Sequence, residues 1–255
     1  MTVSINLRQD GPPDAPALLL IHGTGASLRS WDPMVPLLTD SLHVIRIDLP
    51  GCGGSAKPES YAVPAQARLV GEALDRIGVE HAAVVGHSSG SAFATALTEE
   101  RPDLVSALVF ISFGPNMGAY IAEEIDLGDV PWPDLSDEQV RRLMRSGFRP
   151  GYEIPQEYVD QFRDIDLQVF AAETQSIRAY LKERGLPERL APLGKPLLVL
   201  FGEQDLRWAP SSAAEYRAVP GAQIELLAGA GHSPNLEDPP RTARYVLSFA
   251  ANGRA

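Results

Sequence analysis

The stretch "VVGHSSGSAF", residues 84–93, places two serines between two glycines at the end of an apolar run. A nucleophilic serine at the tip of a strand-to-helix turn is held in strained backbone geometry, so the residues two positions before and after it must be small. Ser88 has Gly86 and Gly90 at these two positions, whereas Ser89 has no glycine at either. We therefore predict that Ser88 is a nucleophile and that the backbone N–H of Ser89 donates to an oxyanion. The alternative is a plain Gly/Ser turn.

A serine hydroxyl needs a base, and the base needs an acid that orients it. Of the five histidines, His232 lies in "GAGHSPNLEDPP", between the last apolar run and the last helical pattern. That position predicts the same sheet edge as Ser88, although a histidine that only braces a loop is the alternative. The other four are expected at the exposed starts of strands (His43, His81), bracing the "HGTG" loop (His22), or inside the serine turn but facing away from Ser88 (His87).

The acid is expected between Ser88 and His232 in sequence, at the end of a strand. The segment "LFGEQDLRW" offers Glu203 and Asp205. We predict Asp205, because it follows the start of the turn, where its side chain can reach a histidine on the neighbouring loop. A helix-capping aspartate is the alternative interpretation.

A second oxyanion donor is expected in "HGTGAS", which follows the first strong apolar run. We predict the backbone N–H of Thr24, with Gly23 as the alternative donor, because flanking glycines let the main chain approach a substrate closely. Gly23 is also expected to contact the substrate. The segment "DLPGCGGS" is interpreted as a structural loop, so Asp48 and Cys52 are given no catalytic role.

Apolar runs rich in Val, Ile and Leu alternate with helical patterns along the chain. Continuous apolar runs of this length are typical of parallel strands covered on both faces. The sequence therefore predicts an α/β fold, with a doubly wound and mostly parallel sheet. The expected strands are residues 17–23, 43–51, 82–88, 107–113 and 196–205.

One segment, residues 114–194, has helical patterns but no strand pattern. We predict a helical cap there, inserted into a core formed by residues 1–113 and 195–255, and placed over the carboxyl ends of the strands, where open α/β sheets bind ligands. Most aromatic side chains of this segment are expected to pack the cap on the core, with two or three lining a pocket. Trp132 from the cap and Trp208 from the core are predicted to contact the substrate.

Composition excludes several classes of protein. The net charge is −11, which argues against nucleic acids and anionic membranes as partners. Cys52 is the only cysteine, so neither an intramolecular disulfide nor a Cys/His zinc cluster can form. No metal or cofactor is expected. Without a signal-peptide pattern or a long apolar run, the expected location is the cytoplasm. The oligomeric state stays open.

Five motifs occur in the order "HGTG", "DLPGCGGS", "GHSSG", "GEQD" and "GHSPNLEDPP". With them, the chain from Leu18 to Phe249 resembles the α/β-hydrolase superfamily, in the branch that holds esterases, enol-lactonases, cofactor-free haloperoxidases and meta-cleavage-product hydrolases. The resemblance implies a Ser-Asp-His triad and an α/β-hydrolase fold. Ser88 departs from the aspartate nucleophile of haloalkane dehalogenases and epoxide hydrolases. Ser233 stands where meta-cleavage hydrolases typically have tryptophan, and one amino-terminal strand pattern replaces the usual two.

The predicted function is a serine hydrolase that cleaves a carboxylic ester, thioester or lactone through an acyl-enzyme on Ser88. Its partner is a small-molecule substrate, expected to be an apolar or aromatic acyl compound. Two alternatives remain: a carbon–carbon bond hydrolase with the same triad, and a ligand-binding receptor on a hydrolase scaffold.

Overall fold

A computed structural model describes residues 3–123, 125 and 130–252. Its strands form one seven-stranded sheet in the order β1-β3-β2-β4-β5-β6-β7. All neighbouring pairs are parallel except β1 with β3, which is antiparallel. The strands are β1 (Leu7–Asp10), β2 (Ala17–Ile21), β3 (His43–Ile47), β4 (Ala82–His87), β5 (Val105–Ile111), β6 (Leu197–Gly202) and β7 (Gln223–Leu227).

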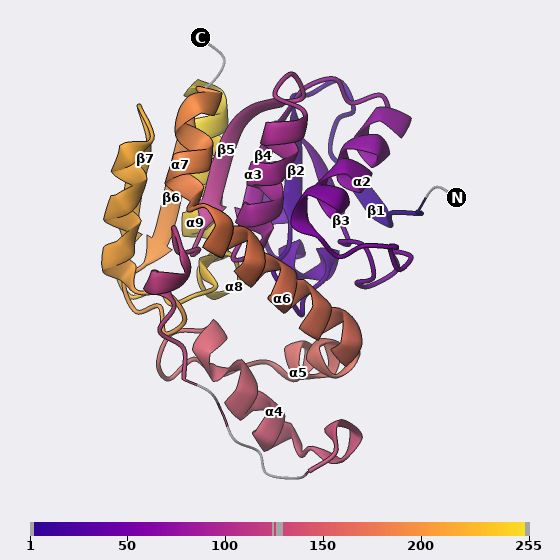
Figure 1. Cartoon of the computed structure of the whole chain (residues 1–255), viewed down its shortest axis with the longest axis vertical. Helices are drawn as coiled ribbons and strands as arrows, with labels where there is room; N and C mark the ends of the chain where they lie inside the picture. The colour runs from indigo at the N-terminus through magenta and orange to yellow at the C-terminus, as the bar shows by residue number, and fades with distance from the viewer. Residues whose placement is uncertain (1–2, 124, 126–129, 253–255) are drawn as a thin grey trace.

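Helices cover both faces of this sheet (Figure 1). Alternate residues of β2 point to opposite faces, as a strand's period of two requires. Leu19 and Ile21 belong to the apolar cluster under α2, α3 and α7, whereas Leu18 and Leu20 belong to the cluster under α1 and α9. These core helices are α1 (Val35–Leu38), α2 (Val63–Arg76), α3 (Gly90–Glu100), α7 (Leu186–Leu190), α8 (Pro234–Glu237) and α9 (Pro239–Asn252).

Short 3₁₀ helices complete the chain. They are η1 (Leu28–Trp31), η2 (Met117–Ala119), η3 (Trp132–Asp134), η4 (Arg145–Gly147), η5 (Ala191–Leu193) and η6 (Pro210–Ala218).

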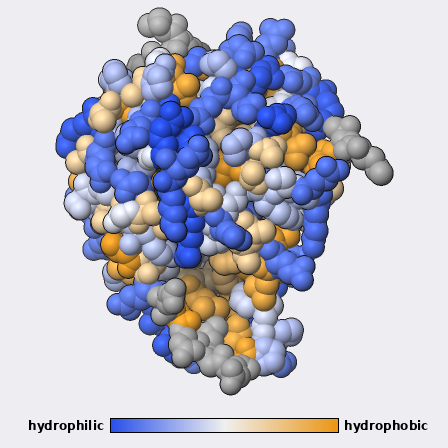
Figure 2. Space-filling view, in the orientation of Figure 1, coloured by the Kyte–Doolittle hydropathy of each residue, from blue (hydrophilic) through white to orange (hydrophobic). Residues whose placement is uncertain are grey.

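The segment between β5 and β6 contains α4 (Asp137–Met144), α5 (Gln156–Arg163) and α6 (Leu167–Glu183). Figure 1 shows α4 and α5 beyond one end of the sheet, with α6 leading back towards the core. Because the loops after β2 and β3 contact α5 and α6, this end is the carboxyl edge of the strands: a Cβ on Gly25 would lie 3.0 Å from Phe170, and one on Gly51 would lie 3.2 Å from Val169. In Figure 2, which has the same orientation, hydrophobic side chains gather in the lower part of the view, where α4 and α5 lie.

The predicted elements match the structure with local differences. The capping box of α4 is present, since Ser136 and Gln139 each accept the other's backbone N–H. The helix α6 ends at Glu183, and Gly185, with a φ of −64°, is the N-cap of α7. The helical pattern expected between β6 and β7 forms the 3₁₀ helix η6, and the described amino-terminal region supplies the single strand β1.

Candidate active site

Ser88 lies at the end of β4 in a left-handed backbone conformation, with a φ of 50°. Few non-glycine residues adopt this conformation, and such strain collects at functional sites. The two flanking glycines make the turn possible. A Cβ on Gly86 would lie 2.4 Å from the Ser91 nitrogen, and a Cβ on Gly90 would lie 2.3 Å from the Ile21 oxygen. The spacing that singled out Ser88 therefore has a steric origin.

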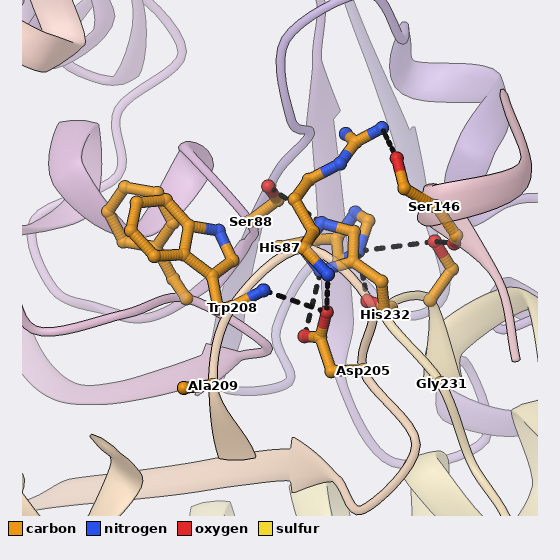
Figure 3. A network of polar contacts seen from close by, with 12 residues as sticks. His87, Ser88, Ser146, Asp205, Trp208, Ala209, Gly231 and His232 are labelled. Carbon is orange, nitrogen blue, oxygen red and sulfur yellow. Dashed lines mark hydrogen bonds and ion pairs between the residues drawn. The ribbon is translucent and has the colours of Figure 1, made fainter. Parts of the chain in front are cut away.

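Three of the predicted side chains meet at the carboxyl edge of the sheet. His232 Nε2 lies 3.0 Å from Ser88 Oγ, and His232 Nδ1 lies 2.9 Å from Asp205 Oδ2. Figure 3 shows them in one chain of contacts. Because a carboxylate only accepts, Nδ1 carries the proton and Nε2 is left to accept the hydroxyl proton of Ser88.

Asp205 has all the partners that a buried carboxylate needs. Its Oδ1 accepts the backbone N–H groups of Arg207 at 2.7 Å and Trp208 at 3.1 Å, while Oδ2 faces His232. Glu203, the alternative acid, is exposed at the same loop. The loop geometry after β6 thus directs Asp205 inward and Glu203 outward.

His87 holds the loop that carries His232. Its Nε2–H donates to the His232 carbonyl at 3.0 Å. Burial, followed by the neighbouring His232, lowers the pKa of His87 to about 3, so the ring stays neutral near neutral pH. Its ring lies beside that of His232, with the two ring centroids 5.3 Å apart, and its bond to the carbonyl helps to hold His232 in place.

The remaining histidines have structural surroundings. His22 Nδ1–H donates to the Gly23 carbonyl at 2.8 Å, and Nε2 accepts the Leu49 N–H at 2.9 Å, so His22 braces its loop. Burial lowers the pKa of His22. His81 is exposed. The expectation that His43 is exposed was wrong, because β1 covers it and Gln9 Oε1 lies 3.0 Å from its Nε2.

The two predicted oxyanion donors are joined by a contact that the sequence did not indicate. The Thr24 backbone N–H donates to Ser89 Oγ at 2.8 Å, and Thr24 Oγ1 lies 2.8 Å from the same oxygen. Gly23 packs against Ser88, since a Cβ there would lie 3.0 Å from Ser88 Cβ. The Thr24 N–H, which was expected to be free to bind an oxyanion, is therefore hydrogen-bonded to the hydroxyl of Ser89.

A cavity of about 620 Å³ opens over Ser88 and His232. Gly23 and Thr24 line it, together with four aromatic side chains of the β5–β6 segment: Phe148, Tyr158, Phe162 and Phe170.

The structure corrects the assignment of the two tryptophans to the pocket, because neither is among the described residues that line the cavity. Trp208 packs between Phe113 and Tyr120, and Trp132 packs against Phe162. Trp132 Nε1–H also donates to the Arg163 carbonyl at 3.4 Å. Both rings therefore stabilise the packing around the cavity.

Two polar residues of the cavity wall, Glu173 and Arg207, were not among the predicted site residues. Glu173 lies in the cavity wall with 0% of its surface exposed, beside Cys52 Sγ at 3.5 Å. It interrupts the apolar stripe of α6 formed by Val169 and Ile177, and that break at four-residue spacing was the available signal. Arg207, in the loop after β6, lines the cavity as well.

The described residues contain neither a metal-binding cluster nor a helix suited to cross a bilayer. They hold no group of three or more His, Cys, Asp or Glu side chains placed to bind a metal ion. None of their helices has the length and apolar character that crossing a bilayer would require.

A sequence profile of the alpha/beta hydrolase family matches residues 18–245, most of the chain. The chain belongs to the alpha/beta hydrolase family. Among its relatives, this hydrolase is 26% identical to 2-(acetamidomethylene)succinate hydrolase of Mesorhizobium japonicum, a match that covers 97% of this chain and 91% of the relative.

The same hydrolase is also 26% identical to carboxylesterase YbfK of Bacillus subtilis, over 95% of this chain and 83% of the relative. Its fold matches the crystal structure of a hydrolase from Pseudomonas aeruginosa PA01 with a TM-score of 0.80 and 25% identity, over 97% of this chain and 94% of that one.

Proposed function

We propose that this hydrolase cleaves a carboxylic ester, thioester or lactone through an acyl-enzyme on Ser88. The observation that carries the proposal is the unbroken chain from Ser88 Oγ through His232 to Asp205, at 3.0 Å and 2.9 Å. All three groups are buried, so water competes little with their hydrogen bonds. The similarity to a carboxylesterase supports an ester as the substrate class.

In the first half of the reaction, Ser88 Oγ attacks the carbonyl carbon while His232 Nε2 takes the hydroxyl proton. Asp205 stabilises the resulting imidazolium through Nδ1–H and keeps the ring in the required orientation. When the tetrahedral intermediate collapses, His232 gives the proton to the departing alkoxide, thiolate or lactone oxygen. A water molecule activated by the same nitrogen then releases the acyl group and regenerates Ser88.

The oxyanion is expected to bind to the backbone N–H groups of Ser89 and Thr24. In the described chain no hydrogen-bond acceptor is bonded to the Ser89 N–H. The Thr24 N–H is bonded to Ser89 Oγ, so the hydroxyl of Ser89 has to rotate aside before this second donor becomes available. The Ser89 N–H therefore acts first, and Thr24 joins as negative charge develops.

Residues 114–194 act as the cap in this proposal, and the aromatic side chains of α5 and α6 cover the substrate's acyl part. Packing supports this division for α4 and α5, which form their own small apolar cluster around Val140 and Val159. The helix α7 packs instead against α3 and η6, so it anchors the cap to the core.

Fluorophosphonate labelling tests the nucleophile directly. We expect one adduct per chain, mapped to Ser88 by peptide mass spectrometry, in the wild type and in Ser89→Ala. The Ser88→Ala variant should not be labelled. An adduct on Ser89 would overturn the assignment. A parallel panel of 4-nitrophenyl esters, thioesters and lactones should show turnover; cleavage restricted to a vinylogous 1,5-diketone acid would favour the carbon–carbon hydrolase instead.

A further inference from the structure

Arg207 is fixed at the catalytic loop by its own main chain. Its N–H donates to Asp205 Oδ1 at 2.7 Å, and its carbonyl accepts the Ile121 N–H at 3.0 Å. Its side chain lines the same cavity as Ser88 and His232. Arg207 follows Asp205 by two positions. The same short loop therefore carries the acid that orients the base and a cationic group in the substrate cavity.

The guanidinium of Arg207 has few partners. Of its five N–H donors, one is bonded within the described residues: Nη2 donates to Ser146 Oγ at 3.1 Å (Figure 3). Its Nε is buried without a hydrogen-bond partner. No carboxylate of the described chain lies within the 4.0 Å of an ion pair with it. Asp205, its acidic neighbour, is already committed to His232 and two backbone N–H groups.

The two buried arginines elsewhere in the molecule make the contrast clear. Arg46 pairs with Asp10 at 2.8 Å and also with Asp32. Arg189 pairs with Glu99 at 3.2 Å and Glu183 at 3.0 Å. A buried charge is costly unless it is paired, and the chain meets that requirement at both of these sites. Arg207 is only half-buried, yet it has no carboxylate partner among the residues described, and the burial of its guanidinium lowers the pKa of that group.

We propose that Arg207 binds a carboxylate of the substrate, so that the preferred esters of this enzyme are anionic. The planar fork of a guanidinium matches a carboxylate through two parallel hydrogen bonds, and the two Nη groups of Arg207 keep N–H donors beyond the one bonded to Ser146. Ser146 holds the guanidinium from the β5–β6 segment, which limits its rotation before a substrate arrives. This inference rests on the proposed function, because it names the substrate class of the same cavity.

Matched esters test the proposal through kinetics. Mono(4-nitrophenyl) adipate and 4-nitrophenyl hexanoate differ by a carboxylate at the end of the acyl chain. A second pair, 3-carboxyphenyl hexanoate and phenyl hexanoate, places the carboxylate on the leaving group. We expect the wild type to prefer the anionic member of one pair by about tenfold or more in kcat/KM, the size of a charge-assisted hydrogen bond.

Replacement of the arginine should remove this preference. Arg207→Gln should lower kcat/KM for the preferred anionic ester about tenfold or more, mainly through KM, and change the neutral ester less than about threefold. Arg207→Lys should restore part of the preference, because it keeps the charge without the fork. Arg217→Gln, which removes an exposed arginine outside the cavity, controls for net charge and should change neither ester.

If Arg207→Gln lowered kcat/KM equally for both members of a pair, Arg207 would have only a structural role, and the proposal would be overturned. A wild type that prefers the neutral ester in both pairs would also overturn it.

A binding measurement separates this inference from the proposed catalytic role. In a Ser88→Ala background, calorimetry should give tighter binding for monomethyl adipate than for dimethyl adipate, and adding Arg207→Gln should weaken only the former, about tenfold. If esters are not hydrolysed but this difference is found, the proposed function fails and the carboxylate site stands. If both ligands bind alike, the carboxylate site fails whatever the rate of hydrolysis. Arg207→Lys replaces Arg207→Gln if the latter does not fold.

Discussion

Two buried carboxylates beside the catalytic cavity have opposite surroundings. Asp205, behind His232, uses both oxygens, which face the imidazole and accept two backbone N–H groups. Glu173, on α6, has a single thiol partner, Cys52 Sγ, on Oε1, and its Oε2 is buried without a partner. Burial raises the pKa of Glu173 to about 7.

The difference separates a group held in place from a group left available. Three donors around Asp205 fix its orientation, as an acid that orients a base requires. Little around Glu173 favours its charge, so it is easily kept neutral and can donate or accept a hydrogen bond in the cavity. Mutations at the two places should therefore have different effects. Those at Asp205 and the residues it serves should lower the reaction rate, whereas those at Glu173 should change how stability depends on pH.

The largest effect is expected for the nucleophile that Asp205 serves through His232. Ser88→Ala should lower kcat on the best 4-nitrophenyl ester by about 10⁶, the size found when a triad nucleophile is removed. Ser89→Ala is the matched control, since only its backbone N–H is used, and it should keep activity within about tenfold. Stopped assays at protein concentrations determined by absorbance measure kcat for both variants. A small loss of kcat in Ser88→Ala would contradict the assignment of Ser88 as the nucleophile, and with it the catalytic role of Asp205.

Asp205→Asn should come next, with a loss of about 10⁴ in kcat, because an amide in place of the carboxylate favours the wrong tautomer of His232. Its control is Glu203→Gln two residues earlier, an exposed acid whose neutralisation should change kcat less than about threefold. Steady-state kinetics of the two purified variants decide the matter. If Glu203→Gln were the damaging change, the acid would have been misassigned.

Glu173→Gln should act on stability. A carboxyl group whose pKa rises from 4.5 in an unfolded chain to about 7 in the folded protein stabilises the fold while protonated, and this contribution is lost as the pH rises towards and past 7. The wild type should therefore lose about 2 kcal/mol of unfolding free energy between pH 5.5 and 8.5 relative to Glu173→Gln. Urea denaturation of both proteins at the two pH values measures this difference. Parallel pH profiles would show that Glu173 does not titrate in this range.

The smallest effect concerns the thiol beside Glu173. Burial, then the nearby Glu173 charge, raises the pKa of Cys52 well above its usual range. At pH 8, iodoacetamide should therefore alkylate Cys52 at less than about a tenth of the rate for a free cysteine. Glu173→Gln removes one of the causes and should speed the reaction severalfold, as followed by intact-protein mass spectrometry. Alkylation of the wild type as fast as free cysteine would contradict the burial of this pair.

The parts of the site that the sequence predicted are those that local spacing determines. Gly86 and Gly90 mark Ser88 because the turn excludes any Cβ at their positions, and the ends of β6 and β7 bring Asp205 and His232 to the same edge. These features follow from chain order and sterics, both of which are readable from residue types.

Long-range packing decides the rest. Trp208 was predicted to contact the substrate because it follows Asp205, yet its ring turns to pack against Phe113. The surroundings of Arg207 and Glu173 depend on residues 61 and 121 positions away, Ser146 and Cys52. No local sequence pattern indicates which distant residue will contact a side chain. The sequence therefore did not reveal that Arg207 and Glu173 have so few hydrogen-bond partners.

The contact between Ser88 and His232 spans 144 residues of chain. The serine belongs to the fourth strand of the sequence, while the base follows the seventh and last one. A nascent chain that has left the ribosome only through β5 can form the turn around Ser88 but has no base. Because contacts so distant in sequence form late in folding, recovery of hydrolase activity should report the final docking of β6 and β7, later than the recovery of helical circular dichroism.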